Sequence, residues 1–300
     1  MDFALLRDAF WGLTFDGLAL GAIYALISLG YTLVYGVLRL INFAHSEVFM
    51  IGTFSALVAS GIMGVKVEDD PRTGWGMVFT LLICLIAAML ASGITAVLVE
   101  IIAYRRLRQR GATKLATLIS AIGVSISLVE LFRIITDSLP REFPRIMDKT
   151  FLFSYAGADI RNDKVIVIIA AGLMMFALER FISKSRYGKG IRAVSMDENT
   201  ATLMGVNINK VITVTFLAGG MMAGAAAFFY ILVYENTSFK VGFFLGISAF
   251  TAAVLGGIGN LKGALFGGFM LGVLETWTSA VFGTAWKAVI SFLILVLVLL

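Results

Sequence analysis

The 300-residue chain is 59% hydrophobic and only 14% charged, whereas a soluble domain carries about a quarter charged residues. Its formal charge of +5 reflects loops at a membrane surface rather than nucleic-acid binding, and the single cysteine, Cys84, excludes an intrachain disulfide. The apolar runs are continuous and do not alternate as barrel strands do, so the composition predicts an all-α polytopic membrane protein.

Nine apolar runs follow one another along the chain. They lie near residues 11–37, 46–64, 76–102, 115–136, 164–182, 209–234, 242–258, 264–281 and 288–300. A bilayer core of about 30 Å needs about 20 apolar residues per helix, and glycines at 246, 256 and 257 interrupt the seventh run. We expect about eight transmembrane helices, some broken or re-entrant, in one transmembrane domain over residues 1–300. We also expect the native chain to continue past the ninth run.

The first polar cluster lies between the first two runs and comprises Asn42, His45, Ser46 and Glu47. Charged side chains inside a membrane usually face a cavity, a polar partner or the interface, so these residues are candidates for a translocation pathway. Alternatively, Asn42 or Ser46 caps a half-helix and Glu47 lies in its first turn, near the positive end of the helix dipole. The sequence leaves both interpretations open. His45 is the only histidine, and we expect no metal site.

Charged linkers predict the orientation of the chain. The linker 104–114 holds five basic residues and no acid, which is typical of a cytoplasmic loop. The polar segment 183–210 comes two spans later and is therefore expected on the same side. The long loop 137–164 and the short loop 235–241 are expected on the opposite side, where they offer a surface for a partner.

Within 183–210 the sequence predicts a short amphipathic helix. Asp197 or Asn199 is placed to cap it, and Gly205 is placed to end it. Its small apolar face would comprise Ala201, Leu203 and Met204. Such a helix at a membrane surface indicates docking to a soluble partner.

Acidic residues in the runs have mostly structural interpretations. Glu130 and Arg133 are three residues apart and are expected to pair. Glu100, Glu179 and Glu275 lie near the ends of runs, from which they can reach the interface. A proton-coupled carrier would need such acids to face one pathway, and their spacing does not show this.

Small residues form a second informative pattern within the apolar runs. The pairs Gly17/Gly21, Gly220/Gly224 and Gly263/Gly267 are four residues apart, a spacing that favours close helix packing. A denser cluster, comprising Gly256, Gly257, Gly259 and Asn260, predicts a helix break. Broken helices at membrane depth line protein-filled or water-filled space, so this cluster is a second candidate for the pathway.

Catalytic motifs are missing from the chain. It has no phosphate-binding GxxxxGK[ST] loop, no GxSxG and no HExxH. We therefore expect no enzyme. Uphill transport would need an ion gradient or energy from another polypeptide.

Three blocks in order closely resemble one family. They are GLALGAIYALISLGYTLVYGVLRLINFAHSEVFMIG, SRYGKGIRAVSMDENTATLMGVNINKVITVTFLAGGMMAGAAA and FLGISAFTAAVLGGIGNLKGALFGGFMLGVLE. Together they resemble the LivH/LivM-type permeases, the membrane subunits of bacterial branched-chain amino-acid ABC importers, and are more similar to the LivH side. One departure is Ser46, where the family pattern FAHGE has glycine.

The resemblance implies uptake of branched-chain or related amino acids across the bacterial inner membrane. Its partners would be a second related permease, two cytoplasmic ATPase subunits carrying ATP and Mg, and an extracytoplasmic solute-binding protein. This chain itself would bind no cofactor. Other amino acids, urea or short amides are alternative substrates, and an ion-coupled secondary carrier is a further alternative.

The resemblance also implies a coupling helix that contacts an ATPase subunit. The residues expected there are Arg186, Gly188, Arg192, Asp197, Glu198, Asn199, Ala201, Leu203, Met204 and Gly205.

Overall fold

The computed structural model describes residues 3–155 and 157–300. The longer helices are α2 (Phe10–Leu38), α3 (His45–Ile62), α4 (Gly74–Val99), α6 (Lys114–Ile135), α7 (Asn162–Lys184), α10 (Ile208–Tyr234), α11 (Val241–Leu255), α12 (Leu261–Phe282) and α13 (Trp286–Leu299). Shorter helices are α1 (Phe3–Asp8), the π-helix η1 (Glu100–Arg105), α5 (Arg106–Gln109), α8 (Arg186–Met196) and α9 (Glu198–Leu203). The strands are β1 (Arg141–Glu142), β2 (Phe151–Tyr155), β3 (Ala158–Arg161) and β4 (Asn236–Thr237).

The predicted helical membrane fold is confirmed. Among the described residues, 7 helices are long and apolar enough to cross a bilayer, counting α4 through to Gln109 as one. The remaining two apolar runs form α11 and α13, which are shorter. At 15 residues, α11 is only about 22 Å long, less than the thickness of a bilayer core. It is the broken element that the glycine-interrupted run predicts.

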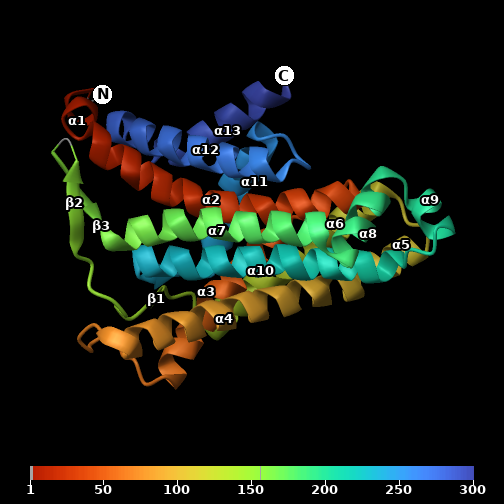
Figure 1. Cartoon of the computed structure of the whole chain (residues 1–300), viewed down its shortest axis with the longest axis horizontal. Helices are drawn as coiled ribbons and strands as arrows, with labels where there is room; N and C mark the ends of the chain where they lie inside the picture. Colours follow the sequence, from red (N-terminus) through yellow and green to blue (C-terminus); the bar gives the residue numbers. More distant parts are fainter. Residues whose placement is uncertain (1–2, 156) are drawn as a thin grey trace.

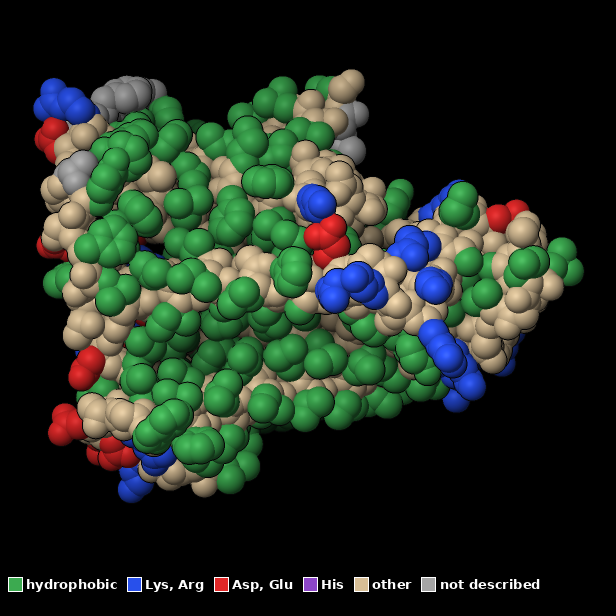
Figure 2. All heavy atoms as spheres, viewed as in Figure 1, with side chains coloured by type: hydrophobic (Ala, Val, Ile, Leu, Met, Phe, Trp, Pro, Cys, Tyr) green, Lys and Arg blue, Asp and Glu red, His purple; other side chains and the backbone are tan. Residues whose placement is uncertain are grey.

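The long helices run between two ends of the molecule, which differ in the side chains that they carry (Figure 1). One end carries α5, α8 and α9, and we call it the α8–α9 end. There the linker 104–114 meets the segment 183–210, since Arg108 Nη2 donates to Asn209 Oδ1 at 2.6 Å. Lys and Arg side chains gather at this end in Figure 2, and hydrophobic side chains cover the helices between the ends. The expected placement of these two polar segments on one side is therefore confirmed.

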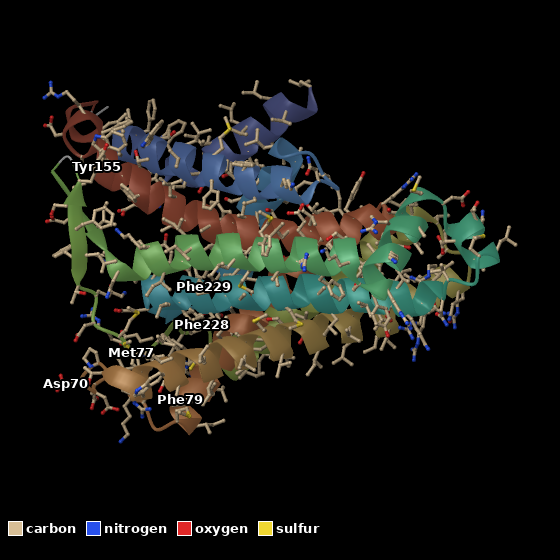
Figure 3. The ribbon with its side chains drawn as sticks, viewed as in Figure 1. Asp70, Met77, Phe79, Tyr155, Phe228 and Phe229 are labelled. Carbon is tan, nitrogen blue, oxygen red and sulfur yellow. The ribbon has the colours of Figure 1, made fainter. Side chains whose placement is uncertain are left out.

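The opposite end, which we call the β-strand end, joins the two loops expected there. β1 pairs with β4 in antiparallel register, Arg141 opposite Thr237, and thus ties the loop 137–164 to the loop 235–241. β2 and β3 form a separate antiparallel pair, and Tyr155 and Asp70 mark this end in Figure 3. Tryptophans cluster near helix ends here, as in a membrane-interface belt: Trp11 lies against Tyr155, and Trp277 Nε1 donates to the Thr14 hydroxyl.

The core is organised around α2, which is buried along most of its length. α2 and α12 run in opposite directions and touch backbone to backbone: a Cβ added at Gly272 would lie 2.3 Å from the Gly21 nitrogen. α10 and α4 meet in the same manner through Gly220 and Gly224. The expected role of the spaced glycines in helix packing is thereby confirmed for α2 and α10.

Three expectations about single residues are wrong. Glu275 does not reach the interface, since it is buried and its carboxylate accepts from the Tyr24 hydroxyl at 2.6 Å. Gly246 lies inside α11 and does not break it. Glu100 does not reach the interface: it is fully buried, and Arg105 reaches it instead. In a π-helix residues i and i+5 lie over each other, so the π-helical turn brings this acid and this base together.

Candidate functional site

The polar cluster at residues 42–47 is buried at the start of α3. The helix begins at His45 after Ala44, and no side chain caps it. Asn42 lies two residues before the N-cap position, Ala44, and its Oδ1 accepts from the Ala44 amide at 3.1 Å, while the Ser46 hydroxyl donates to the Phe43 carbonyl. Capping by Asn42 or Ser46 is therefore wrong, although Glu47 does lie in the first turn.

His45 packs into a slot on α2. A Cβ added at Gly30 would lie 2.3 Å from His45 Nε2, and the imidazole meets the Tyr31 ring edge-on with centroids 4.7 Å apart. His45 is thus a packing residue in this structure. Within residues 3–155 and 157–300, no three His, Cys, Asp or Glu side chains lie close enough to hold a metal ion.

Glu47 occupies the wall of a cavity of about 880 Å³. Its side chain is fully buried, and Oε1 accepts a hydrogen bond from the Ser125 hydroxyl at 3.2 Å. Oε1 also lies 3.1 Å from the Ser46 hydroxyl, whose single proton it shares with the Phe43 carbonyl at 2.8 Å. Oε2 is buried and accepts no hydrogen bond from the described residues. The cavity lies between α3, α6, α11 and α13, with apolar walls that include Ile126 and Phe250.

Glycines on α11 allow this helix to lie directly on the start of α3. A Cβ added at Gly242 would lie 2.4 Å from the Ser46 carbonyl oxygen, and one at Gly246 would lie 2.4 Å from Ser46 Cβ. The close approach is therefore made with a serine at position 46, because the facing helix supplies the glycines.

The predicted helix break at Gly256–Asn260 is present, but it does not lie at the Glu47 cavity. Gly257 and Gly259 have φ of 84° and 98°, a conformation that glycine adopts readily, and Asn260 Oδ1 caps α12 by accepting from the Gly263 amide at 3.2 Å. None of the four candidate residues of this segment lines the Glu47 cavity. The segment joins α11 to α12 on the side of the α8–α9 end, where Lys262 pairs with Glu179 at 3.1 Å. The two candidate pathway clusters therefore do not form one site.

The predicted short helix in the segment 183–210 is α9. Asp197 caps it, since its Oδ1 accepts from the Asn199 amide at 2.8 Å and the Thr200 amide at 3.2 Å. Hydrogen bonding from Thr200, and then from Asn199, lowers the pKa of Asp197. Gly205, with φ of 81°, follows the helix end. Asp197 rather than Asn199 is the cap.

The apolar face of α9 is divided between core and surface. Ala201 is buried, whereas the side chains of Leu203 and Met204 are 88% and 80% exposed at the tip of the α8–α9 end. Arg186, Arg192, Glu198 and Asn199 lie at this end as well, none of them buried.

Sequence reasoning missed the second helix of this segment, α8. The signals for it are Ser185, whose hydroxyl caps α8 by accepting from the Gly188 amide at 2.8 Å, and the buried pair Ile191 and Val194 three residues apart. Gly188 permits the tight α7–α8 turn, since an added Cβ would lie 2.1 Å from the Ile182 carbonyl oxygen.

A polar network that the sequence did not reveal links the segment after α9 to the start of α3. Arg105 bonds to the Glu100 carboxylate and, at 2.7 Å, to the Thr213 hydroxyl on α10. One residue before Arg105, the Tyr104 hydroxyl donates to Asn42 Oδ1 at 2.9 Å. Thus α10, which directly follows α9, is connected through η1 to the residues before Glu47.

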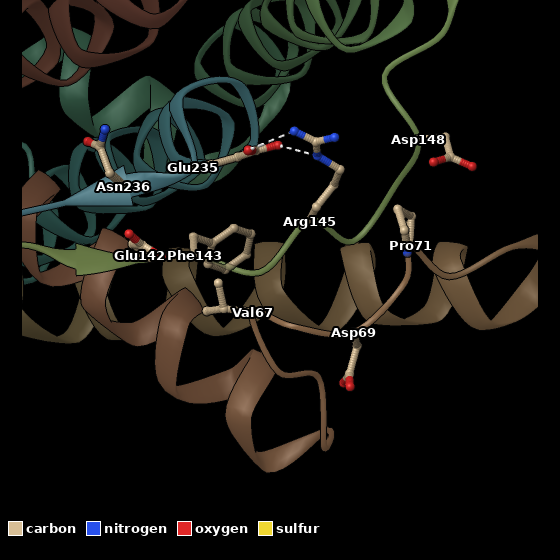
Figure 4. Close-up of a pocket in the computed structure, with 9 residues that line it drawn as sticks. All are labelled: Val67, Asp69, Pro71, Glu142, Phe143, Arg145, Asp148, Glu235 and Asn236. Atoms are coloured by element: carbon tan, nitrogen blue, oxygen red, sulfur yellow. Dashed lines mark hydrogen bonds and ion pairs between the residues drawn. The ribbon is translucent and has the colours of Figure 1, made fainter.

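A polar pocket of about 510 Å³ opens at the β-strand end (Figure 4). Arg145 Nε donates to Glu235 at 3.0 Å, and Lys149 Nζ lies 2.6 Å from the same carboxylate. Partial burial raises the pKa of Glu235, but hydrogen bonds from Arg145 and Lys149 and the charges of both outweigh it and lower the pKa overall. Asp69 and Glu142 also line this pocket.

Comparison with known proteins identifies the family to which this chain belongs. A solved ABC transporter in an inward-facing conformation superimposes with a TM-score of 0.50 at 15% identity, covering 98% of this chain and 88% of that one, which supports the fold. The permease BraD of Pseudomonas aeruginosa is 39% identical over 288 residues, 95% of this chain and 91% of its own length. LivH of Escherichia coli K12 is 38% identical over 290 residues, with the same coverage. Both are high-affinity branched-chain amino-acid transport permeases. The family model "Branched-chain amino acid transport system / permease component" matches residues 13–299, and the chain belongs to that family.

Proposed function

We propose that this chain is the membrane-spanning subunit of a bacterial inner-membrane ABC importer that takes up branched-chain amino acids. A second related permease completes the pathway, two cytoplasmic ATPase subunits carry ATP and Mg, and an extracytoplasmic binding protein delivers the amino acid. This chain holds no cofactor of its own and performs no chemistry. The family match over residues 13–299 carries the proposal.

The α8–α9 end supports its coupling role. The helices at this end project beyond the apolar part of the molecule and carry basic residues, which favours a cytoplasmic location by the positive-inside rule (Figure 2). Leu203 and Met204 are exposed there, outside the lipid, where an apolar side chain gains nothing unless a protein partner covers it. We assign α8 and α9 as the coupling helices that fit a groove on an ATPase subunit.

Alternating access would then follow from motion of this end. Closure of the ATPase dimer moves α8 and α9, and α10 follows because it is the next helix. The Arg105–Thr213 and Tyr104–Asn42 hydrogen bonds carry the displacement towards the start of α3 and the Glu47 cavity. At the other end, the joined loops around β1 and β4 form the platform for the binding protein.

Reconstitution tests this proposal. The assembled transporter in proteoliposomes is supplied with ATP inside and with leucine-loaded binding protein outside. Leu203→Ser combined with Met204→Ser should lower leucine uptake roughly tenfold or more, since truncating interface hot spots costs about 2 kcal/mol. Leu115→Ser is the matched control, because Leu115 is 66% exposed in the first turn of α6. Leucine affinity of the isolated binding protein should not change.

Two results would count against the proposal. Full ATP-dependent uptake by the double variant would remove α9 as the coupling element. Leucine uptake by this polypeptide alone, without nucleotide, would instead identify an ion-coupled carrier.

A further inference from the structure

The first turns of α3 and α11 meet in the interior of the protein. The chain enters α3 from the α8–α9 end, where Arg39 Nη2 donates to the Ser195 carbonyl at 3.1 Å, and it enters α11 from the β-strand end, shortly after β4. A Cβ added at Gly242, in the first turn of α11, would lie 2.4 Å from the Ser46 carbonyl oxygen in the first turn of α3. Two segments that come from opposite ends of the molecule therefore touch where each begins a helix.

The N-terminus of α11 has unmet hydrogen-bond donors. Lys240 occupies its N-cap position, no side chain caps the helix, and its first turn contains no acid. The Val241 amide donates to the Ser238 carbonyl at 3.1 Å, but the next amides of a first turn have no partner inside their own helix. These amides also carry the positive end of the helix dipole. The helix therefore offers donors and partial positive charge to an acceptor beside its first turn.

The carboxylate of Glu47 lies beside that turn with one oxygen unpartnered. A Cβ added at Gly242 would lie 2.8 Å from Glu47 Oε2, so this oxygen faces the glycine surface of α11. Oε2 is shielded from solvent and accepts no hydrogen bond from the described residues, while the Ser125 hydroxyl holds Oε1 at 3.2 Å. No Lys or Arg within residues 3–155 and 157–300 pairs with Glu47. A buried acceptor without a partner is costly, and the amides of a helix N-terminus bind a carboxylate strongly.

We propose that Glu47 is a positioning residue that caps α11 during the transport cycle. Gly242 and Gly246 present no side chains to α3, so α11 can shift along α3 without side chains that interlock. In the present structure Glu47 Oε2 lies against the first turn of α11 but accepts no hydrogen bond from it. When the ATPase dimer closes, a shift of α11 brings its free amides onto Oε2. Reopening of the dimer releases them.

This cap connects the coupling helices to a wall of the cavity. Displacement of α8 and α9 reaches the start of α3 through the hydrogen bonds of Arg105 and Tyr104 on η1. α11 supplies one wall of the 880 Å³ cavity, with Phe244 and Phe250, so a shift of α11 changes the width of that cavity. The inference rests on the proposed function, to which it adds the residue that passes the ATPase-driven movement from α3 to α11.

Glu47→Leu in the assembled transporter tests the cap, because the new side chain is of similar size and has no acceptor. The number of leucine molecules taken up into proteoliposomes per ATP hydrolysed should fall roughly tenfold, the effect of one lost hydrogen bond to a charged group. A variant that only folded or assembled poorly would lower uptake and hydrolysis together and leave this ratio unchanged. The unfolding temperature should not fall, since replacing a buried, incompletely paired charge by an apolar side chain is often neutral or stabilising.

Two further variants serve as controls. Glu47→Gln keeps an acceptor oxygen without the charge, so its ratio of uptake to hydrolysis should lie between those of Glu47→Leu and the wild type. Glu130→Leu makes the same chemical change elsewhere in the cavity. Glu130 is half exposed and paired with Arg133 at 2.7 Å, and this variant should keep the wild-type ratio.

Hydrogen–deuterium exchange observes the cap itself. The complex is compared without nucleotide and with a non-hydrolysable ATP analogue and Mg, which keep the ATPase dimer closed. In the wild type, the amides of the first turn of α11 should exchange roughly tenfold more slowly in the closed state, because each gains a carboxylate acceptor. In Glu47→Leu these amides should exchange equally fast in both states.

The outcomes distinguish the two proposals. If the wild-type complex takes up no leucine with ATP, the proposed function fails and this inference fails with it. If the wild-type complex transports leucine and Glu47→Leu keeps the wild-type ratio of uptake to hydrolysis, only the cap is overturned. The same holds if exchange at the start of α11 is equal in the two wild-type states, or if Glu47→Leu retains the protection.

Discussion

The contact between α11 and α3 supplies a sharp test of the structure, through Gly246→Ala. A Cβ at position 246 would lie 2.4 Å from Ser46 Cβ, whereas ordinary contacts between such atoms begin near 3.4 Å. The two helices must therefore separate by about 1 Å at the wall of the Glu47 cavity. Inserting a methyl group into a packed interface costs about 1–3 kcal/mol.

This magnitude corresponds to a measurable change in thermal stability. For a chain of this size 1 kcal/mol shifts the unfolding temperature by about 2–4 °C, so a cost near the middle of the range lowers Tm by about 4–8 °C. Cys84, the only cysteine, is fully buried, and a thiol-reactive fluorogenic dye therefore reports unfolding of the purified permease in detergent. Gly36→Ala is the control on α2, because a Cβ there meets no atom within 4 Å.

The same steric clash predicts which second substitution should restore stability. Ser46→Gly removes the Cβ that Gly246→Ala meets, and the nearest remaining contact, with the Ser46 Cα, is at 3.4 Å. Alone, Ser46→Gly should cost about 2 kcal/mol, from a lost hydrogen bond and from glycine in a helix. The double variant should be no less stable than Ser46→Gly alone. Additive losses in the double variant would refute the packing described for α11 and α3.

The remaining predictions concern the charged contacts outside the cavity. Arg105→Leu leaves the fully buried Glu100 without its main partner and should cost about 3 kcal/mol in the same dye assay, whereas a double change to Gln at both positions should cost less. The pKa of Glu235 is lowered in the fold, so its contact with Arg145 is fully present above about pH 4.3, the ordinary glutamate value, and is lost as the pH falls through the lower folded value. Arg145→Gln should therefore flatten the acid limb of a Tm-against-pH curve. Asp197→Ala should raise hydrogen–deuterium exchange over α9 and reduce ATP-driven uptake, while Asp197→Asn, which keeps the capping oxygen, should change neither; equal exchange in both variants would contradict the cap.

Local interactions explain what could be read from the sequence. Continuous apolar runs identified the membrane helices, because the need to satisfy backbone groups in lipid leaves a helix as the only local solution. The cap at Asp197 and the helix break at Gly257 depend on neighbours within a few residues. Arg133 and Glu130 pair across one helical turn, so their spacing alone predicts the contact. The family resemblance was likewise carried by local blocks.

Long-range contacts explain what the sequence did not reveal. Asn42 and Glu47 were candidates from composition, but their partners, Tyr104 and Ser125, lie 62 and 78 residues further along the chain. The burial of the Glu100 side chain depends on a π-helical turn, which no residue type in the sequence predicts.

The sequence by itself determined the membrane-helical fold, the side shared by the two basic segments, the capped helix α9 and the family. These follow from hydropathy, charge and short-range hydrogen bonding. Only the tertiary structure decided that α11 lies on the start of α3 and that Glu47 lines a cavity with Lys240, 193 positions away in the sequence printed above. The physical reason is that a cavity is defined by helices that meet in space, and no local pattern specifies which helices those are.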